Sequence, residues 1–326
     1  MKPVPTVPTL DIVIVNWNAG EQLRQCLASM GRVRCRDFAL NRVIVVDNGS
    51  TDGSAEGLEA CGVPLLLLPQ GRNAGFSRAC NAGAAASTAD YLLFLNPDTL
   101  LYEDSLEEPV AFMERPDNAQ VGIAGIALAD EHGHVSVTCG RFPRLRHFLY
   151  QSTGLNRLLP GLFRHYLMNE WDHQSDREVG FVIGAFFLIR RELFRRLGGF
   201  DERFFVYFEE IDLAYRLYRE GYSCRYLAGS KAYHKGGGVS ENVKAARLFY
   251  FLRCRLQYAY KHFSPGAARL HRWSTMGLEP AARHLLGWLK GAPAERQETR
   301  EGYRLLREWL RTERPQAARP RQEAVK

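Results

Sequence analysis

The chain has 326 residues, of which 46% are hydrophobic and 24% charged, and its net charge is +7, a profile typical of a folded protein large enough for one α/β domain with an appendage. Its seven scattered cysteines include no C-x-x-C pair, which argues against a zinc site or a disulfide framework and fits a reducing cytosol. The first nine residues are Pro-rich and predict no signal peptide, and no apolar run approaches the ~18 residues of a membrane span.

Residues 10 to about 130 alternate apolar, strand-like runs with segments of helical periodicity. This alternation predicts a mostly parallel sheet with helices on both faces. The carboxyl ends of such strands meet at one edge, where open α/β sheets bind ligands. Polar residues follow three of the four predicted strands, which are Ile12–Val15, Val43–Val46, Leu65–Leu68 and Tyr91–Leu95.

The region from about 121 to 239 is less regular. Strands are predicted at 121–128 and 135–137, and 141–177 lacks clean periodicity, which predicts a long loop region. A strongly apolar run at 179–189 is interrupted at Gly184, and a helix is predicted from Glu209 to Glu220.

The last part of the chain, 240–311, has helical periodicity and interleaves aromatic with basic residues. From residue 240 to the end there are 18 Lys and Arg against 8 Asp and Glu, or +10, so residues 1–239 carry 7 − 10 = −3. Such a segment can lie on an anionic surface, either a membrane or a nucleic acid. It can equally be a solvated appendage with its arginines turned outward. Beyond 311 the polar, Pro-containing composition predicts disorder.

Asp98, in the segment Asn96-Pro97-Asp98, ends the most apolar strand. A carboxylate at a sheet edge can hold Mg²⁺ or Mn²⁺, which prefer oxygen ligands and bridge to substrate phosphates, and Asn96 could add a neutral oxygen. The same three residues could also be a simple turn before a helix.

Asp47 ends the second strand. Its carboxylate could accept a hydrogen bond from the imide N–H of a pyrimidine, or could cap the turn Asn48-Gly49-Ser50. Asn73, Phe76 and Asn81 could line a nucleotide pocket, or could satisfy local backbone groups.

Three carboxylates, those of Glu209, Glu210 and Asp212, begin the helix after an aromatic run. One explanation for the three carboxylates is that acidic residues stabilise a helix N-terminus, by ~0.3–1 kcal/mol each. An apolar setting also raises carboxylate pKa values, as a general base near neutral pH requires. His234 precedes a lysine and the glycine run 236–238, which would suit either a structural role or a loop that closes over a phosphate.

In combination and in this order, the motifs resemble the family 2 glycosyltransferases with a GT-A fold, most closely the rhamnosyltransferase-like branch. The resemblance covers about residues 9–240 and implies a Rossmann-like, mostly parallel α/β sheet flanked by helices, with a C-terminal helical appendage. The motifs that carry it are Ile12–Asn18, Val46–Ser54, Gly71–Gly83, Leu95–Asp98, Gly184-Ala185, Gly199–Glu202, Phe208–Leu213 and His234.

The resemblance also implies roles for single residues. It assigns pyrimidine binding to Asp47 and places Asp98 on the metal-binding Asp-x-Asp motif, with His234 as a second ligand of Mg²⁺ or Mn²⁺. Glu210 falls on the catalytic base, with Glu209 and Asp212 as the alternatives. Asn96 replaces an acidic residue and Glu210 replaces the more usual Asp. The implied nucleotide-sugar site comprises Asn16, Asn18, Asp47, Asn73, Phe76, Asn81, Asn96 and Gly184.

The expected function is an inverting, metal-dependent transfer of a sugar from dTDP-rhamnose or a UDP-sugar to a saccharide or lipid-linked acceptor. The alternative is a catalytically inactive protein of the same fold that binds nucleotide sugar or glycan. A nicotinamide oxidoreductase is disfavoured, because no G-x-G-x-x-G follows the first strand.

We expect a cytoplasmic protein and no nucleic-acid partner, and an anionic membrane at the inner face is left open as a partner of 240–311. The predicted organisation is a flexible leader (1–9), a glycosyltransferase domain (10–239), a basic helical region (240–311) and a disordered tail (312–326).

Overall fold

The computed structural model describes residues 7–236, 243–313 and 315. The chain forms two compact units. The first, the sheet unit, comprises 1–142, 167–205 and 209–239, and the second, the helical unit, comprises 143–166, 206–208 and 240–326. Parts of the predicted leader, of the glycine run and of the predicted tail lie outside the described residues.

The sheet unit is built on a nine-stranded sheet with the order β3-β2-β1-β4-β10-β6-β11-β5, with β8 paired to β11. Its first four strands are parallel, and β10 runs antiparallel between β4 and β6. The strands are β1 (Thr9–Asn16), β2 (Ala39–Asp47), β3 (Leu65–Pro69), β4 (Tyr91–Leu95), β5 (Thr99–Leu101), β6 (Val121–Ala129), β8 (Arg177–Val179), β10 (Phe186–Arg190) and β11 (Ser223–His234), with β7 (Cys139–Gly140) and β9 (Phe181–Val182) forming a separate pair.

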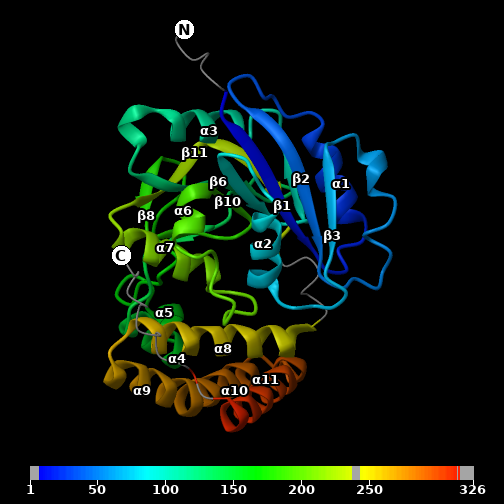
Figure 1. The fold of residues 1–326 in the computed structure, drawn as a ribbon. Helices are drawn as coiled ribbons and strands as arrows, with labels where there is room; N and C mark the ends of the chain where they lie inside the picture. The colour runs from blue at the N-terminus through cyan, green and yellow to red at the C-terminus, as the bar shows by residue number, and fades with distance from the viewer. Residues whose placement is uncertain (1–6, 237–242, 314, 316–326) are drawn as a thin grey trace, which may run out of the picture. The chain divides into compact units, whose positions relative to one another are not determined.

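Helices cover both faces of this sheet, which explains why its central strands are apolar on both sides. One face packs against Leu27 of α1 and Met113 of α3, and the other contacts α2, α6 and α7, which Figure 1 shows in front of the sheet. The flanking elements are α1 (Glu21–Met30), η1 (Leu58–Cys61), α2 (Phe76–Ala85), α3 (Glu107–Glu114), η2 (Pro116–Asn118), α6 (Arg191–Arg196) and α7 (Glu209–Arg219). The predicted α/β fold is thus confirmed.

Some local predictions were wrong. The predicted loop region 141–177 contains α4 (Leu145–Thr153) and α5 (Leu155–Leu158), and the predicted strand at 135–137 is a single bridge at Val135. The long strand β11 was not foreseen, because its outer half pairs irregularly and its sequence mixes polar with apolar residues.

The helical unit consists of helices, as the periodicity of 240–311 predicted. They are α4, α5, α8 (Lys244–His262), α9 (Pro265–Trp273), the π-helical η4 (Ser274–Leu278), α10 (Glu279–Leu289) and α11 (Pro293–Thr312). Leu252 and Leu256 of α8 pack with Tyr303, Leu306 and Trp309 of α11 in a core of their own. None of the helices in the described part of the chain is long and apolar enough to cross a bilayer.

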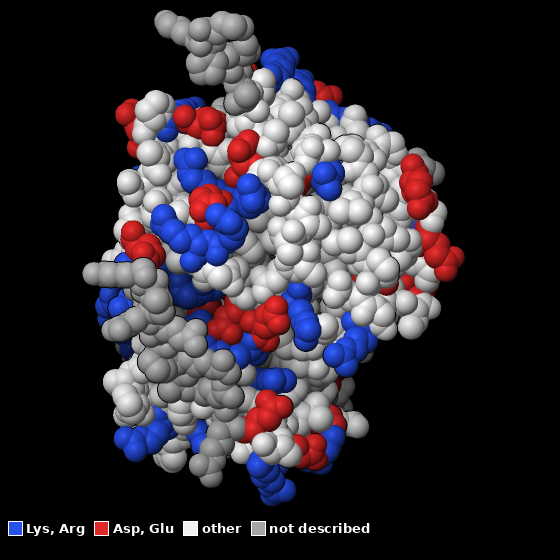
Figure 2. Space-filling view, in the orientation of Figure 1, with Lys and Arg blue, Asp and Glu red and all other residues white. Residues whose placement is uncertain are grey.

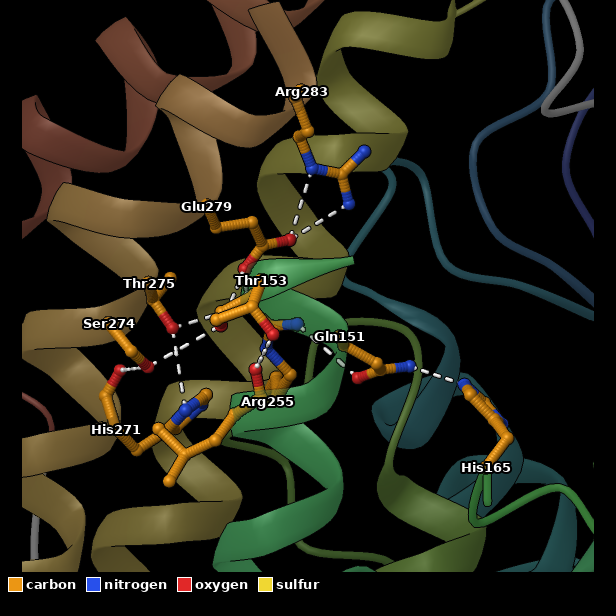
Figure 3. Close-up of polar contacts among 11 residues, drawn as sticks. Gln151, Thr153, His165, Arg255, His271, Ser274, Thr275, Glu279 and Arg283 are labelled. Carbon is orange, nitrogen blue, oxygen red and sulfur yellow. Dashed lines mark hydrogen bonds and ion pairs between the residues drawn. The ribbon is translucent and has the colours of Figure 1, made fainter. Parts of the chain in front are cut away.

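A buried polar network ties α4, α8, α9 and α10 together (Figure 3). Glu279 is bound by Arg255 and Arg283, and both Arg255 and Glu279 are almost fully buried. His271 lies against the same cluster, with Nδ1 3.5 Å from the hydroxyl of Thr275. This network belongs to the helical unit alone.

Candidate active site

The ends of β1 and β2 form one polar cluster. Asn16 and Asp47 are register partners, and the buried amide of Asn16 donates to Asp47 Oδ1 at 3.0 Å and to Ser54 Oγ at 2.9 Å. Asn18 has a left-handed backbone with φ 52°, and its Oδ1 accepts from the backbone N–H of Thr51 at 2.8 Å. Three of the predicted nucleotide-binding residues are therefore brought together around one turn.

Asn48 is a residue that the sequence interpretation passed over. It is buried, donates from Nδ2 to Asn73 Oδ1 at 3.0 Å, and accepts from the backbone N–H of Ala74 at 2.9 Å. The next residue, Gly49, has φ 79°, and a Cβ there would lie 2.6 Å from Arg72 Cα. Asn48-Gly49 therefore joins the turn after β2 to the loop that carries Asn73. The Asn48-Gly49 pair is visible in the sequence, but by itself it predicts only a turn.

Phe76 begins α2 and faces Gly184, where an added Cβ would lie 3.6 Å from the Phe76 ring. The backbone N–H of Phe76 donates to Phe205 O at 2.6 Å, and the hydroxyl of Ser77 donates to Phe204 O at 2.6 Å. The start of α2 is thereby fixed to the segment that leads toward α7.

Asn81, further along α2, makes a two-sided bond with the backbone of Phe200. Its Nδ2 donates to Phe200 O and its Oδ1 accepts from Phe200 N–H, both at 2.9 Å. The side-chain amide of Asn81 thus holds the turn that follows α6.

Asp98 and His234 lie side by side. Strand β5 pairs with β11 so that His234 is opposite Thr99, and His234 Nε2 is 3.3 Å from Asp98 Oδ1. Both side chains are largely buried, at 9% exposed for Asp98 and 11% for His234. Asn96 adjoins the pair in sequence, and its backbone N–H donates to Ala185 O at 3.2 Å. The predicted metal-site residues therefore meet at the end of β4.

The pair fits a divalent cation that takes most of its ligands from elsewhere. The described residues hold no group of three or more His, Cys, Asp and Glu that could bind a metal. Mg²⁺ and Mn²⁺ are nevertheless commonly held by one or two protein side chains, with waters and substrate phosphate oxygens completing the shell. One carboxylate and one imidazole match that pattern.

The three carboxylates of α7 differ in their surroundings. Asp212 is fully buried and accepts from Arg216 Nε at 2.8 Å, while the same guanidinium donates to Leu197 O at 2.6 Å and Gly199 O at 2.7 Å. Glu209 is also buried, whereas Glu210 is partly exposed. Burial and, secondarily, the charge of Glu209 raise the pKa of the Cys80 thiol in α2, so Glu209 lies toward that helix.

The backbone immediately before α7 is strained. Tyr207 and Phe208 are consecutive non-glycine residues in the left-handed region, with φ 75° and 73°. Each such residue costs about 1–3 kcal/mol, and strain of this kind clusters at functional sites. The acidic start of α7 is thus held in an orientation that an ordinary helix entry would not give.

Comparison with known proteins identifies the family of the chain. Residues 11–198 match the profile of the family described as Glycosyl transferase family 2. The chain belongs to this family. The predicted family and fold class are confirmed, and glycosyltransferase activity follows from the membership.

Two curated relatives within this family are rhamnosyltransferases. The chain is 28% identical over 297 residues to the N-acetylglucosaminyl-diphospho-decaprenol L-rhamnosyltransferase of Mycobacterium tuberculosis, covering 85% of this chain and 92% of the relative. It is 30% identical over 169 residues to the rhamnosyltransferase WbbL of Escherichia coli, covering 52% and 61%.

A solved mannosyltransferase of Pyrobaculum calidifontis, in complex with GDP-Man and Mn²⁺, has a similar fold. The match has a TM-score of 0.54 at 16% identity and covers 94% of this chain and 87% of that one. At this identity the likeness concerns the fold alone.

Proposed function

We propose that this glycosyltransferase moves a sugar from a pyrimidine nucleotide-diphosphate sugar to a lipid-linked saccharide, with inversion at the anomeric carbon. The proposal is carried by the pairing of Asp98 with His234 at the end of β4, beside β1 and β2, whose ends hold Asn16 and Asp47. The names of the curated relatives favour a deoxysugar donor such as dTDP-rhamnose and a polyprenyl-diphosphate acceptor.

The donor is bound at two places on the sheet edge, its base at one and its diphosphate at the other. The carboxylate of Asp47, oriented by the amide of Asn16, accepts the imide N–H of a thymine or uracil ring. A Mg²⁺ or Mn²⁺ ion held by Asp98 and His234 would neutralise the negative charge of the diphosphate. Phe76 and Gly184 adjoin each other, and a side chain at position 184 would take up space beside the Phe76 ring.

Glu210 is assigned as the general base. Of the three candidates Asp212 is fully buried and paired with Arg216, and Glu209 is 4% exposed, so Glu210 is the most exposed of the three. Its carboxylate accepts the proton of the acceptor hydroxyl as that oxygen bonds to C1 of the sugar. The bond from C1 to the diphosphate oxygen breaks on the opposite face, and its electron pair leaves with the nucleoside diphosphate.

The deciding experiment measures transfer from dTDP-rhamnose and UDP-sugars to an N-acetylglucosaminyl-diphospho-polyprenol analogue, with Mn²⁺ or a chelator. We expect transfer with inverted configuration by NMR, and its loss with the chelator. Glu210→Gln should lower kcat by about 10²–10⁴-fold while the Kd for the donor stays unchanged.

Glu192→Gln, an exposed change in α6, is the matched control and should leave transfer intact. A larger loss of kcat in Glu209→Gln than in Glu210→Gln would move the base to Glu209. Full turnover in the chelator would refute the assignment of a metal to Asp98 and His234.

A further inference from the structure

Most of the large apolar side chains that are exposed in the described part of the chain belong to the helical unit. Several lie on the continuous segment formed by α9, η4 and α10, which follow one another beside α8 and α11 (Figure 1). The exposed apolar residues on this segment are Leu270, Trp273, Leu278, Leu285, Trp288 and Leu289. We call these six residues the outer stripe.

The outer stripe forms one face of the helical segment. With exposed Gly277 and Ala281 included, the positions 270, 273, 277, 281, 285 and 288 recur every three or four residues, as expected for one side of a helix, and Leu278 and Leu289 each follow one of them directly. The opposite side is buried against α4 and α8, where His271, Ser274 and Glu279 lie in the polar network. The outward position of the two tryptophans, at 60% and 63% exposed, is therefore fixed by packing on the inner side.

The charged residues exposed within the segment 269–290 are all cationic, and one of them, Lys290, is paired with exposed Glu295 of α11 at 4.0 Å. Between 269 and 290 every exposed residue is apolar, a glycine or one of Arg269, Arg272 and Lys290. The one acidic residue of this segment, Glu279, is buried between Arg255 and Arg283 and contributes no exposed charge. The exposed charges of the segment itself are therefore all positive, and Arg269 and Arg272 form the cationic border of the stripe.

An arginine-lined groove adjoins Trp273. It has a volume of about 610 Å³ and lies between α8, α9 and α11. Arg269, Arg272, Arg307 and Arg311 line it together with Tyr260, and no ion pair joins any of the four arginines to an acidic residue among those the structure describes. Unpaired guanidinium groups beside an exposed indole suit phosphate headgroups.

We propose that the outer stripe docks the enzyme onto an anionic lipid bilayer. Trp273, Trp288 and the leucines enter the boundary between headgroups and acyl chains, as amphipathic helices with a basic border do. The arginines of the groove bind lipid phosphates. This proposal rests on the proposed function in one respect only: docking would bring the enzyme to a lipid-linked acceptor.

Charge complementarity selects the lipid over a second copy of this chain. A symmetric dimer through the stripe would bring the same cationic border from both copies together, and like charges facing each other disfavour association. Charges of both signs are interspersed on the face drawn in Figure 2. That face therefore has no broad field of one sign that could attract a membrane in place of the stripe.

The test is co-sedimentation of the full chain with vesicles of phosphatidylcholine, with and without phosphatidylglycerol. We expect binding only to the anionic vesicles, weakened about tenfold or more in Trp273→Ser/Trp288→Ser. Replacing Arg269 and Arg272 with glutamine should weaken it by about fivefold for each arginine. Tyr102→Ser, at an exposed aromatic residue of the sheet unit, is the control and should bind like the natural chain.

Several outcomes would overturn the proposal. They are absence of binding to anionic vesicles, unchanged binding in both stripe variants, and equally stripe-dependent binding to a DNA duplex. A dimer in sedimentation velocity that disappears in the tryptophan variant, with vesicle binding unchanged, would assign the stripe to a second copy. Transfer to a lipid-free acceptor analogue should be unchanged in the stripe variants, whereas Glu210→Gln should lose transfer and keep vesicle binding. Failure of the docking surface and failure of the proposed chemistry are therefore distinguishable.

Discussion

Asp212 and Glu210 are two residues apart, and the difference in their surroundings is the reason why we propose different roles for them. Asp212 is enclosed and bound to Arg216, whose guanidinium also holds two backbone carbonyls at the end of α6. Glu210 lies on a more open side of the same helix turn. In the proposed function, the carboxylate of Asp212 positions the helix and that of Glu210 accepts the proton of the acceptor.

This division predicts different effects of two conservative variants. Asp212→Asn removes one partner of a buried ion pair and should lower the free energy of unfolding by about 3 kcal/mol. Glu210→Gln should lower that free energy by less than Asp212→Asn does, within about 1 kcal/mol, because Glu210 is partly exposed and glutamine keeps the size of the side chain. Urea denaturation followed by circular dichroism measures both. Equal stability of Asp212→Asn and the natural chain would contradict the positioning role.

The residues that could be predicted follow apolar strands. Asn16, Asp47 and Asp98 each come directly after a buried run, so their place at one sheet edge follows from strand geometry. The contact between Asp98 and His234 depends on the pairing of β5 with β11, which are far apart in sequence. Neither strand was predicted from the sequence. Their local patterns are too short or too mixed to indicate a partner, and only the resemblance brought the two residues together.

At the scale of elements, α2 packs unusually close to β1. A Cβ at Gly83 would lie 2.4 Å from Val13 Cγ1, whereas a Cβ at Gly266 in α9 would meet nothing within 4 Å. Gly83→Ala should therefore destabilise the protein by about 1–3 kcal/mol through overpacking. Gly266→Ala should be neutral or stabilising by up to about 1 kcal/mol, because it only restricts the unfolded chain.

Differential scanning calorimetry of these two glycine variants compares the same substitution in two helices. Gly83→Ala should also raise the KM for the donor, since α2 carries Phe76. A Gly83→Ala variant as stable as Gly266→Ala would show that α2 can move away from the sheet without cost.

The polar network of α8, α9 and α10 predicts a dependence of stability on pH. Burial and, secondarily, the charge of Arg255 hold the pKa of His271 well below its usual 6.5. The unfolded chain therefore takes up a proton at His271 as pH falls through 6.5, before the folded chain does, and stability drops. Burial alone would raise the pKa of Glu279, but the charges of Arg255 and Arg283 outweigh it and lower the pKa below 4.5, so a second loss follows as pH falls through 4.5.

Thermal unfolding across this pH range should show both losses of stability. His271→Gln should remove the loss that begins near pH 6.5 and leave the one that begins near 4.5. An unchanged profile in His271→Gln would mean that another group causes the first loss.

At the scale of the whole molecule, each unit has its own hydrophobic core. The core of the sheet unit joins α1 and α3 to the strands, and that of the helical unit joins α8 to α11. Contacts within a unit decide which segments open together, because local stability follows local burial. A core truncation should therefore loosen its own unit first.

Leu306, fully buried in α11, provides the test, and Leu306→Ala should cost about 2–5 kcal/mol. Hydrogen exchange followed by mass spectrometry should show faster exchange in α8 and α11, while β1 and β4 keep their protection. The matched change in the other core is Leu93→Ala in β4, which should give the reverse pattern. If both variants accelerate exchange equally in α8, α11, β1 and β4, the two cores unfold as one cooperative unit. Separate responses would mean that the helical unit can loosen, for example at low pH through His271, while the sheet unit, which holds Asp98 and Glu210, keeps its structure.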